Sequence, residues 1–207
     1  MLWIIAGIII SYLIGSIPTA YIFGRLLKGI DIRKFGSGNV GATNALRVLG
    51  KKAGAIVLIL DLLKGFVAVF LAGNWVIARA LSLNEEIIRV LFGVASIAGH
   101  NWTIFLNFKG GKGVAATFGV ILGLAMAMPG LRMVFLLLLV TWLVIFLIFR
   151  IVSIASIGAA VSLPLYMVFF HQSATLVSLS FILAAFIILR HKSNLKRFLE
   201  GKEGRSF

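Results

Sequence analysis

The sequence predicts an all-α integral membrane protein with seven transmembrane helices, its N-terminus outside and its C-terminus in the cytoplasm. Of its 207 residues, 61% are hydrophobic and only 13% are charged, and the mean hydropathy is +1.10. A soluble domain has about 45–50% apolar and about 25% charged residues, so this composition excludes an ordinary soluble domain. The chain contains no cysteine, which excludes disulfides and a cysteine nucleophile.

Seven mostly apolar stretches are long enough to cross a bilayer, which takes about 20 residues within a range of about 17–25. They cover residues 1–23, 53–72, 88–107, 114–130, 133–149, 151–170 and 173–189. The first stretch is uncharged and longer than the core of a signal peptide, about 7–15 residues, so we expect a retained helix. No repeat or low-complexity linker divides the chain, so residues 1–207 are predicted to form one membrane domain.

The basic residues predict the orientation of these spans. Loop 24–52, loop 108–113, Arg150 and the tail 190–207 carry most of the Lys and Arg, and all fall on one side of a seven-span arrangement. Short basic loops stay in the cytoplasm, which places the N-terminus outside. The net charge of +14 therefore indicates a membrane face rather than a nucleic-acid surface.

The first basic loop contains FGSGNVGATNALR, whose three glycines have the spacing of a dinucleotide-binding fingerprint. That fingerprint requires a preceding strand and a βαβ unit, and neither is predicted here. Glycines still let a backbone approach an anion closely, and a helix start attracts anions. We expect Thr43 or Asn44 to cap the following helix and Arg47 to contact phosphate oxygens.

A second glycine-rich basic loop, KGGKG at residues 109–113, precedes another predicted helix. The dipole of that helix favours an anion at its start. Basic glycine loops are also ordinary cytoplasmic turns. Two of them on one membrane face nevertheless favour a site for phosphate-bearing substrates.

Four segments carry a longer pattern: GSGNVGATNALRVLGKKAG, GH…F…FKGGKGVA, RIVSIASI and RHKSNLKRFLEGKE. Together they resemble the bacterial acyl-phosphate:glycerol-3-phosphate acyltransferases of the PlsY type, from about Ile17 to Glu203. Thr103 stands where that family usually has Pro, a departure that removes no candidate ligand. The resemblance implies a multi-pass enzyme of the bacterial cytoplasmic (inner) membrane, with its active site on the cytoplasmic side.

The implied reaction moves a fatty acyl group from acyl phosphate to the 1-hydroxyl of sn-glycerol 3-phosphate. It gives lysophosphatidic acid and phosphate, with no cofactor and no metal. The implied partners are acyl phosphate, glycerol 3-phosphate, membrane lipid and the soluble enzyme that forms acyl phosphate, and nucleic acid is not among them. Acyl chain-length preference, oligomeric state and binding order do not follow from the sequence.

The resemblance also implies site residues. The substrate- and phosphate-binding residues would be Ser37, Gly38, Asn39, Gly41, Thr43, Asn44, Arg47, His100, Lys109, Gly110, Gly111, Lys112 and Ser156. The catalytic residues would be Ser153, His191 and Asn194.

Several of these residues have a structural alternative. Serines in membrane helices often bond to the backbone, which applies to Ser153 and Ser156, and an ionisable group such as His100 inside a span needs a partner. Asp61 and Lys64 stand three residues apart in the second span, where a mutual ion pair is favoured over a direct role in the site.

The chemistry is expected to be direct attack of the glycerol hydroxyl, because no carboxylate is predicted beside either His100 or His191. The general base stays open between His191 and the phosphate of the donor. A transporter for organic phosphates and a membrane scaffold are the rival classes. A transporter is disfavoured because a carrier's site lies near the midplane, whereas both loops lie on one face.

Overall fold

A computed structural model describes residues 1–79 and 84–204, and every regular element in these ranges is helical. The all-α prediction is therefore confirmed for the described residues. The chain forms two compact units, Met1–Ala127 and Met128–Phe207, which we call the N-terminal unit and the C-terminal unit and describe separately. A single domain over the whole chain stays a prediction.

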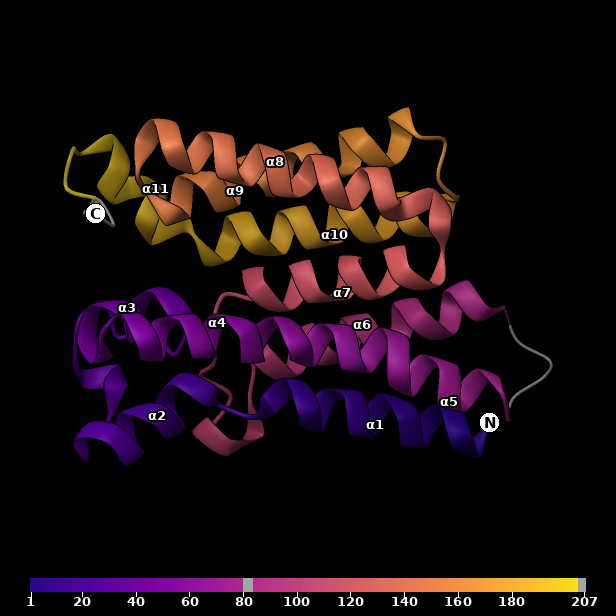
Figure 1. The fold of residues 1–207 in the computed structure, drawn as a ribbon, viewed down its shortest axis with the longest axis horizontal. Coiled ribbons are helices and arrows are strands. Elements are labelled where there is room, and N and C mark those ends of the chain that lie inside the picture. Colours follow the sequence, from indigo (N-terminus) through magenta and orange to yellow (C-terminus); the bar gives the residue numbers. More distant parts are fainter. Residues whose placement is uncertain (80–83, 205–207) are drawn as a thin grey trace. The chain divides into compact units, whose positions relative to one another are not determined.

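The N-terminal unit places its two glycine-rich loops toward one end of its helices. Its elements are α1 (Leu2–Ser16), α2 (Thr19–Lys28), η1 (Ile32–Lys34), α3 (Ala42–Leu49), α4 (Lys51–Phe66), η2 (Val67–Ala72), α5 (Gly73–Ile77), α6 (Glu85–Asn101), η3 (Ile104–Leu106) and α7 (Val114–Ala127). Figure 1 shows the N-terminus and α5 at one end of this unit, and α2, α3 and the chain that leads into α7 toward the other.

Glycines let the long helices of this unit approach closely. A Cβ on Gly15 of α1 would overlap the backbone of Ser96 in α6, and a Cβ on Gly99 would overlap the backbone of Tyr12. Helices α4 and α7 meet in the same way at Gly119. Small residues at such contacts are typical of helix packing in membranes, where close van der Waals contact drives association.

Arg89 is buried inside α6, in the predicted span 88–107, and sequence analysis assigned it no role. Its Nη1 donates to the carbonyl of Val69 at 3.1 Å and its Nη2 donates to Asn74 Oδ1 at 2.7 Å. The carboxylate of Glu85 lies 3.7 Å away and is largely exposed. Val69 belongs to η2, a π-helical segment that interrupts the α-helix between α4 and α5. Arg89 therefore bonds across to an irregular turn, which compensates for its burial.

The C-terminal unit contains four longer helices after one short turn. Its elements are η4 (Pro129–Leu131), α8 (Arg132–Phe149), α9 (Val152–Phe169), α10 (Ala174–Arg190) and α11 (Lys192–Leu199). Arg150, at φ 57°, ends α8 and turns the chain into α9. The rings of Phe149 and Phe198 meet edge to face with centroids 6.3 Å apart, so this turn packs against α11.

Most of the predicted spans are helices of sufficient length. Among the described residues, five stretches are long and apolar enough to cross a membrane: Leu2–Lys28, Lys51–Ile77, Glu85–Leu106, Pro129–Phe149 and Val152–Phe169. A sixth is added if Ala174–Arg190 is taken together with Lys192–Leu199, from which it is bent by 58°. The remaining predicted span, 114–130, contains α7, whose 14 residues extend only about 21 Å. Seven crossings and the orientation of the termini therefore stay predictions.

We expect Arg89→Leu to destabilise the protein by about 2 kcal/mol, because it removes two hydrogen bonds from a buried charged group. The measurement is the thermal unfolding midpoint of the purified protein in detergent. Glu85→Gln is the matched control and should shift the midpoint little, because the exposed Glu85 makes only a long contact. An unchanged midpoint for Arg89→Leu would show that its bonds to η2 and α5 contribute no stability.

Candidate functional site

Asn44 organises the first glycine-rich loop from inside. Its side-chain Oδ1 accepts a hydrogen bond from the backbone N–H of Ser37 at 2.9 Å. Its Nδ2 donates to the carbonyls of Phe35 at 3.1 Å and Asn39 at 2.9 Å. Because Asn44 is only 1% exposed, its amide replaces water as the partner of the loop backbone.

The predicted helix cap is wrong. Helix α3 begins directly after Gly41, which is its N-cap, and no side chain caps it. Thr43 and Asn44 both lie inside the helix, and the amide of Asn44 points back to the loop instead. The loop turns at Gly36 and Gly38, whose φ values of +60° and +71° favour glycine.

The loop residues expected to bind phosphate differ in exposure. Ser37 and Arg47 are exposed. The half-buried residues are Gly38, Asn39, Gly41 and Thr43.

Two basic side chains near this loop bond to other groups of the protein. Arg33 Nη2 lies 2.7 Å from Asp31 Oδ2, and the hydrogen bonds from Arg33 lower the pKa of Asp31 to about 2. The Asp31 carboxylate also accepts from the backbone N–H of Arg33 and so caps η1. Lys28 Nζ donates to the carbonyl of Val48 at 2.6 Å. The Lys28 contact ties α2 to α3, whereas the Asp31–Arg33 pair fixes η1 locally.

The second glycine-rich loop folds back onto the end of α6. The backbone N–H of Gly110 donates to the carbonyl of Asn101 at 3.1 Å, and that of Gly111 donates to the carbonyl of His100 at 2.9 Å. Helix α7 starts immediately after Gly113, whose carbonyl accepts the first-turn hydrogen bond. The loop therefore ends at a helix N-terminus, as the sequence predicted, where backbone N–H groups favour an anion.

The chain between α6 and this loop is tightly turned. Thr103 Oγ1 donates to the carbonyl of Ser16 at 2.5 Å and accepts from the backbone N–H of Phe105. Asn107 and Phe108 both have positive φ, at 54° and 59°, a conformation that costs energy for a bulky residue. At position 103, where the family usually has Pro, this chain therefore has a hydroxyl that anchors the turn to α1.

One hydrophobic cluster joins the first glycine-rich loop to η3, the turn that precedes the second. Its buried members come from α2, η1, the first loop, α3, α4 and η3: Ala20, Ile32, Val40, Ala45, Val57 and Leu106. Leu106 thus brings the chain that precedes Lys109 against the first loop. The expectation that both loops lie at the same end of the helices is confirmed within the N-terminal unit (Figure 1).

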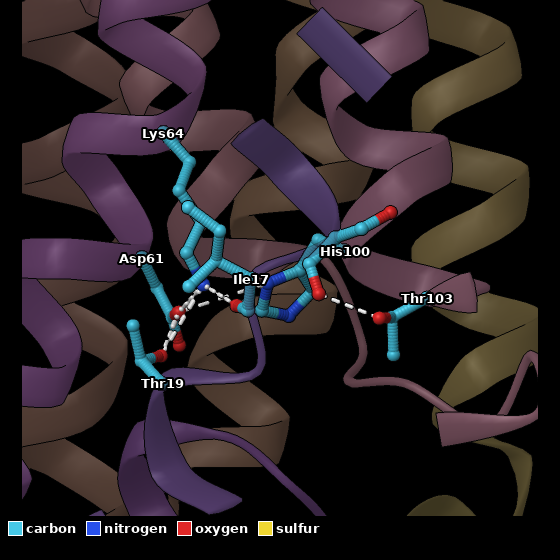
Figure 2. A network of polar contacts seen from close by, with 7 residues as sticks. Ile17, Thr19, Asp61, Lys64, His100 and Thr103 are labelled. Carbon is cyan, nitrogen blue, oxygen red and sulfur yellow. Dashed lines mark hydrogen bonds and ion pairs between the residues drawn. The ribbon is translucent and has the colours of Figure 1, made fainter. Parts of the chain in front are cut away.

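Figure 2 shows a buried polar network around Asp61. Lys64 Nζ lies 2.5 Å from Asp61 Oδ1 and also donates to the carbonyl of Ile17 at 2.6 Å. Thr19 Oγ1 donates to Asp61 Oδ1 at 2.5 Å. The predicted ion pair is therefore confirmed. His100 Nδ1 lies 3.8 Å from Asp61 Oδ1, so the expectation that no carboxylate lies beside this histidine is wrong.

That expectation failed because it rested on sequence neighbours. Asp61 lies in α4 and His100 lies in α6, and only the packing of these helices brings the two side chains together. Both side chains are buried, with exposed fractions of 1% and 7%.

In the C-terminal unit, Glu203 gathers two of the predicted catalytic side chains. Its Oε1 accepts from Ser153 Oγ at 3.0 Å and from Asn194 Nδ2 at 2.5 Å, and its Oε2 accepts from Arg197 Nε at 2.7 Å. Burial raises the pKa of Glu203, but the hydrogen bonds from Asn194, Arg197 and Ser153 outweigh it and leave the pKa below its usual value. Sequence analysis missed this role, although Glu203 ends the tail segment that carried the resemblance.

His191 and Ser156 are each bonded to the backbone of their own helix. His191 Nδ1 lies 2.8 Å from the carbonyl of Ile187, and because a carbonyl only accepts, Nδ1 carries the proton. Ser156 Oγ donates to the carbonyl of Val152 at 2.8 Å and accepts from Trp142 Nε1 at 3.3 Å. Ser156 therefore bonds to the backbone of its own helix, which is the structural alternative considered for it.

No metal centre forms in residues 1–79 and 84–204, where no three His, Asp or Glu side chains come close enough together to hold an ion. The predicted site residues divide between the units. His100 and the two loops belong to the N-terminal unit, and Ser153, Ser156, His191 and Asn194 belong to the C-terminal unit.

Comparison with known proteins gives one consistent family. The family model described as glycerol-3-phosphate acyltransferase matches residues 5–201. Glycerol-3-phosphate acyltransferase 2 of Moorella thermoacetica is 45% identical and covers 98% of this chain and 96% of its own length. Glycerol-3-phosphate acyltransferase of Fusobacterium nucleatum is 41% identical, over 96% of this chain and 95% of its own.

Solved structures agree with these relatives. The crystal structure of PlsY (YgiH), an integral membrane glycerol 3-phosphate acyltransferase, in its glycerol 3-phosphate form has a TM-score of 0.85 and 38% identity. It covers 98% of this chain and 94% of its own. The lysophosphatidic acid form of the same enzyme has a TM-score of 0.82.

The lowered pKa of Glu203 predicts a pH-dependent contribution to stability. A carboxylate whose folded pKa is depressed stabilises the fold above its unfolded pKa, about 4.3, and loses that contribution as the pH falls through the folded value. We therefore expect Glu203→Gln to lower the thermal midpoint at pH 7 and to narrow its difference from the wild type toward pH 3. Glu200→Gln is the control, because the ion pairs of Glu200 within residues 84–204 are with exposed lysines and its loss should matter little at either pH. A Glu203→Gln deficit that is equal at pH 7 and pH 3 would contradict this account.

Proposed function

This chain belongs to the glycerol-3-phosphate acyltransferase family, and on that premise we propose that it transfers a fatty acyl group from acyl phosphate to the 1-hydroxyl of sn-glycerol 3-phosphate. The products are lysophosphatidic acid and inorganic phosphate, which enter phospholipid synthesis. The observation that carries the proposal is the pair of basic glycine-rich loops at one end of the N-terminal unit, where one hydrophobic cluster packs the chain before the second loop against the first. Two basic loops, each followed by a helix N-terminus, suit a reaction in which both substrates bear phosphate.

The loops of the N-terminal unit bind the phosphate groups. In the first loop, Ser37 supplies a hydroxyl and Arg47 a guanidinium, and both residues are exposed. Lys109 and Lys112 flank the glycines of the second loop, next to the start of α7. The glycines leave room for the phosphate oxygens close to the backbone, which a side chain at those positions would obstruct, and the N–H groups at the start of α7 add hydrogen bonds.

The chemistry is a direct transfer. The oxygen of the 1-hydroxyl attacks the acyl carbonyl carbon, an ester C–O bond forms, and the bond from that carbon to the phosphate oxygen breaks. Acyl phosphate is already activated, so holding the two substrates in register supplies much of the acceleration, about 7–11 kcal/mol in favourable cases. The hydroxyl proton leaves to a base, and phosphate departs as the anion.

An acyl-serine intermediate at Ser153 is disfavoured by its partner. Ser153 donates to Glu203, and three donors lower the pKa of that carboxyl. A carboxylate with a lowered pKa is a weak base, so Glu203 activates the serine poorly. The role that follows for Ser153 and Asn194 is contact with substrate from a scaffold fixed by Glu203.

His191 is the side chain best suited to take the proton. With the proton of the neutral ring on Nδ1, facing the Ile187 carbonyl, the lone pair lies on Nε2. The alternative acceptor is the phosphate of the donor itself, which can take the proton as it departs as inorganic phosphate. A positioned general base raises the rate by about 10²–10⁴-fold. The loss of rate when His191 is replaced therefore tells whether His191 or the donor phosphate accepts the proton.

The proposed location is the bacterial cytoplasmic membrane, with seven crossings, the N-terminus outside and the active site on the cytoplasmic side. The basic loops and tail support this orientation, because Lys and Arg of short loops stay in the cytoplasm. Acyl phosphate is then supplied from the cytosol by a soluble enzyme.

We expect the purified protein in detergent to form lysophosphatidic acid from palmitoyl phosphate and sn-glycerol 3-phosphate, and to form none from palmitoyl-CoA. Product is measured by thin-layer chromatography of labelled glycerol 3-phosphate. Lys112→Ala should raise the KM for a phosphate-bearing substrate at least about tenfold, since a charged hydrogen bond contributes about 1.5–3 kcal/mol. Transfer from palmitoyl-CoA alone would overturn the donor, and no transfer from either donor would favour the transporter class.

We expect His191→Ala to lower kcat by about a hundredfold or more at saturating substrate, because the ring accepts the proton in the transition state. His191→Asn is the matched variant that preserves a polar group near Nδ1 but has no basic nitrogen, and it should be equally slow. If both variants turn over at near the wild-type rate, the donor phosphate takes the proton and His191 is structural.

A further inference from the structure

His100 connects the buried network around Asp61 with the second glycine-rich loop. We propose that His100 is a positioning residue: its ring holds the loop 109–113 in the shape that binds phosphate, and Asp61 orients the ring. The inference rests on the proposed function of that loop. It replaces the expectation that His100 contacts substrate itself.

The first step is the contact between the ring and the loop. A Cβ built on Gly111 would fall on His100 Nε2, so the imidazole packs directly against the Gly111 backbone. The backbone of the same residue is bonded to the loop, because the N–H of Gly111 donates to the carbonyl of His100 at 2.9 Å. Gly111 is thus held by both the side chain and the main chain of one residue.

The second step is the contact on the other edge of the ring. His100 Nδ1 faces Asp61 Oδ1 at 3.8 Å, which is beyond hydrogen-bond distance but close enough for a carboxylate to orient an N–H dipole in a buried site. Asp61 is fixed in turn by Lys64 and Thr19 (Figure 2). One edge of the ring therefore faces a rigid carboxylate, and the other faces the loop.

The third step concerns access. The side chain of His100 is 7% exposed, and its two nitrogens face Asp61 and Gly111. A ring held on both edges is poorly placed to bind a substrate phosphate, but well placed to fix the loop that leads into the N-terminus of α7. Losing it should weaken phosphate binding while leaving the chemical step nearly unchanged, which is a KM effect rather than a kcat effect.

Two isosteric amides test which edge of the ring matters. The amide of His100→Gln reaches the position of Nε2, next to Gly111, whereas the amide of His100→Asn reaches only the position of Nδ1, next to Asp61. We expect Asn to raise the KM for a phosphate-bearing substrate at least about tenfold, with kcat within about threefold, and Gln to restore most of the affinity. A general structural defect would affect both amides alike. Equal KM values for Gln and Asn would therefore overturn the proposal.

A double-mutant cycle gives a second test that does not depend on either amide. Gly111→Ala should raise the KM because its methyl group displaces the ring, and His100→Ala should relieve that clash, so the two effects should be strongly non-additive. Gly110→Ala is the matched control. Its Cβ would meet the backbone of His100 and Asn101, which His100→Ala leaves in place, so its effect should persist. Additive effects of His100→Ala and Gly111→Ala would overturn the proposal.

Asp61→Asn tests the orienting carboxylate, since it retains the shape and hydrogen bonding of the side chain but removes its charge. It should raise the KM in the wild-type background and have much less effect on KM in the His100→Ala background. An undiminished effect there would show that Asp61 does not act through His100.

The same assays separate this inference from the proposed function. KM is measured for both palmitoyl phosphate and glycerol 3-phosphate, and the value that rises identifies the phosphate that the loop binds. If the wild type transfers no acyl group, the proposed function fails. If the wild type is active and the KM values of the His100 and Gly111 variants are uncoupled, only the positioning role fails.

Discussion

The break between α1 and α2 is the constraint on which the N-terminal unit depends. A bilayer supplies no water to backbone groups, so carbonyls freed where a helix stops require partners from the protein. Pro18 has no N–H and leaves the end of α1 uncovered. Lys64 donates to the Ile17 carbonyl and Thr103 to the Ser16 carbonyl. Lys64 then requires a counter-charge, which explains why Asp61 lies beside it rather than at the membrane surface.

The two glycine-rich loops, like the break between α1 and α2, depend on buried polar side chains from neighbouring helices. A glycine-rich loop exposes backbone N–H groups to a ligand but has few side chains with which to hold its shape. In both loops a buried polar side chain from an adjoining helix supplies what the glycines lack. Asn44 of α3 bonds to the first loop through its amide, and His100 of α6 packs under Gly111. The rigidity of the loops therefore comes from helices, which is the arrangement that a preorganised anion site requires.

Hydropathy predicted the helices well because the tendency of a segment to enter lipid depends on its local composition. The tertiary partners of a side chain depend on packing and cannot be predicted from local composition. The end of α7 and the break at Pro18 lie inside apolar stretches that look continuous in the sequence. Asn44 was expected to cap a helix because its residue type favours that role, but the loop competes for the same amide. Asp61 and His100 are 39 positions apart and meet only through helix packing. Arg89 was missed because its partners, an irregular turn in η2 and Asn74, have no signature in the sequence.

The net charge of +14 also overstates the positive charge that can contact a substrate. Arg33 is committed to Asp31 and Lys28 to the Val48 carbonyl, and Lys64 neutralises Asp61 deep in the bundle. These cations fix the scaffold, and scaffold charges contribute to phosphate binding only at long range, where salt screens them. In the proposed function, most of the phosphate binding then comes from groups at contact distance, which are helix N-termini and a few side chains of the loops. That agrees with the presence of both glycine-rich loops among the segments that carry the resemblance to the family.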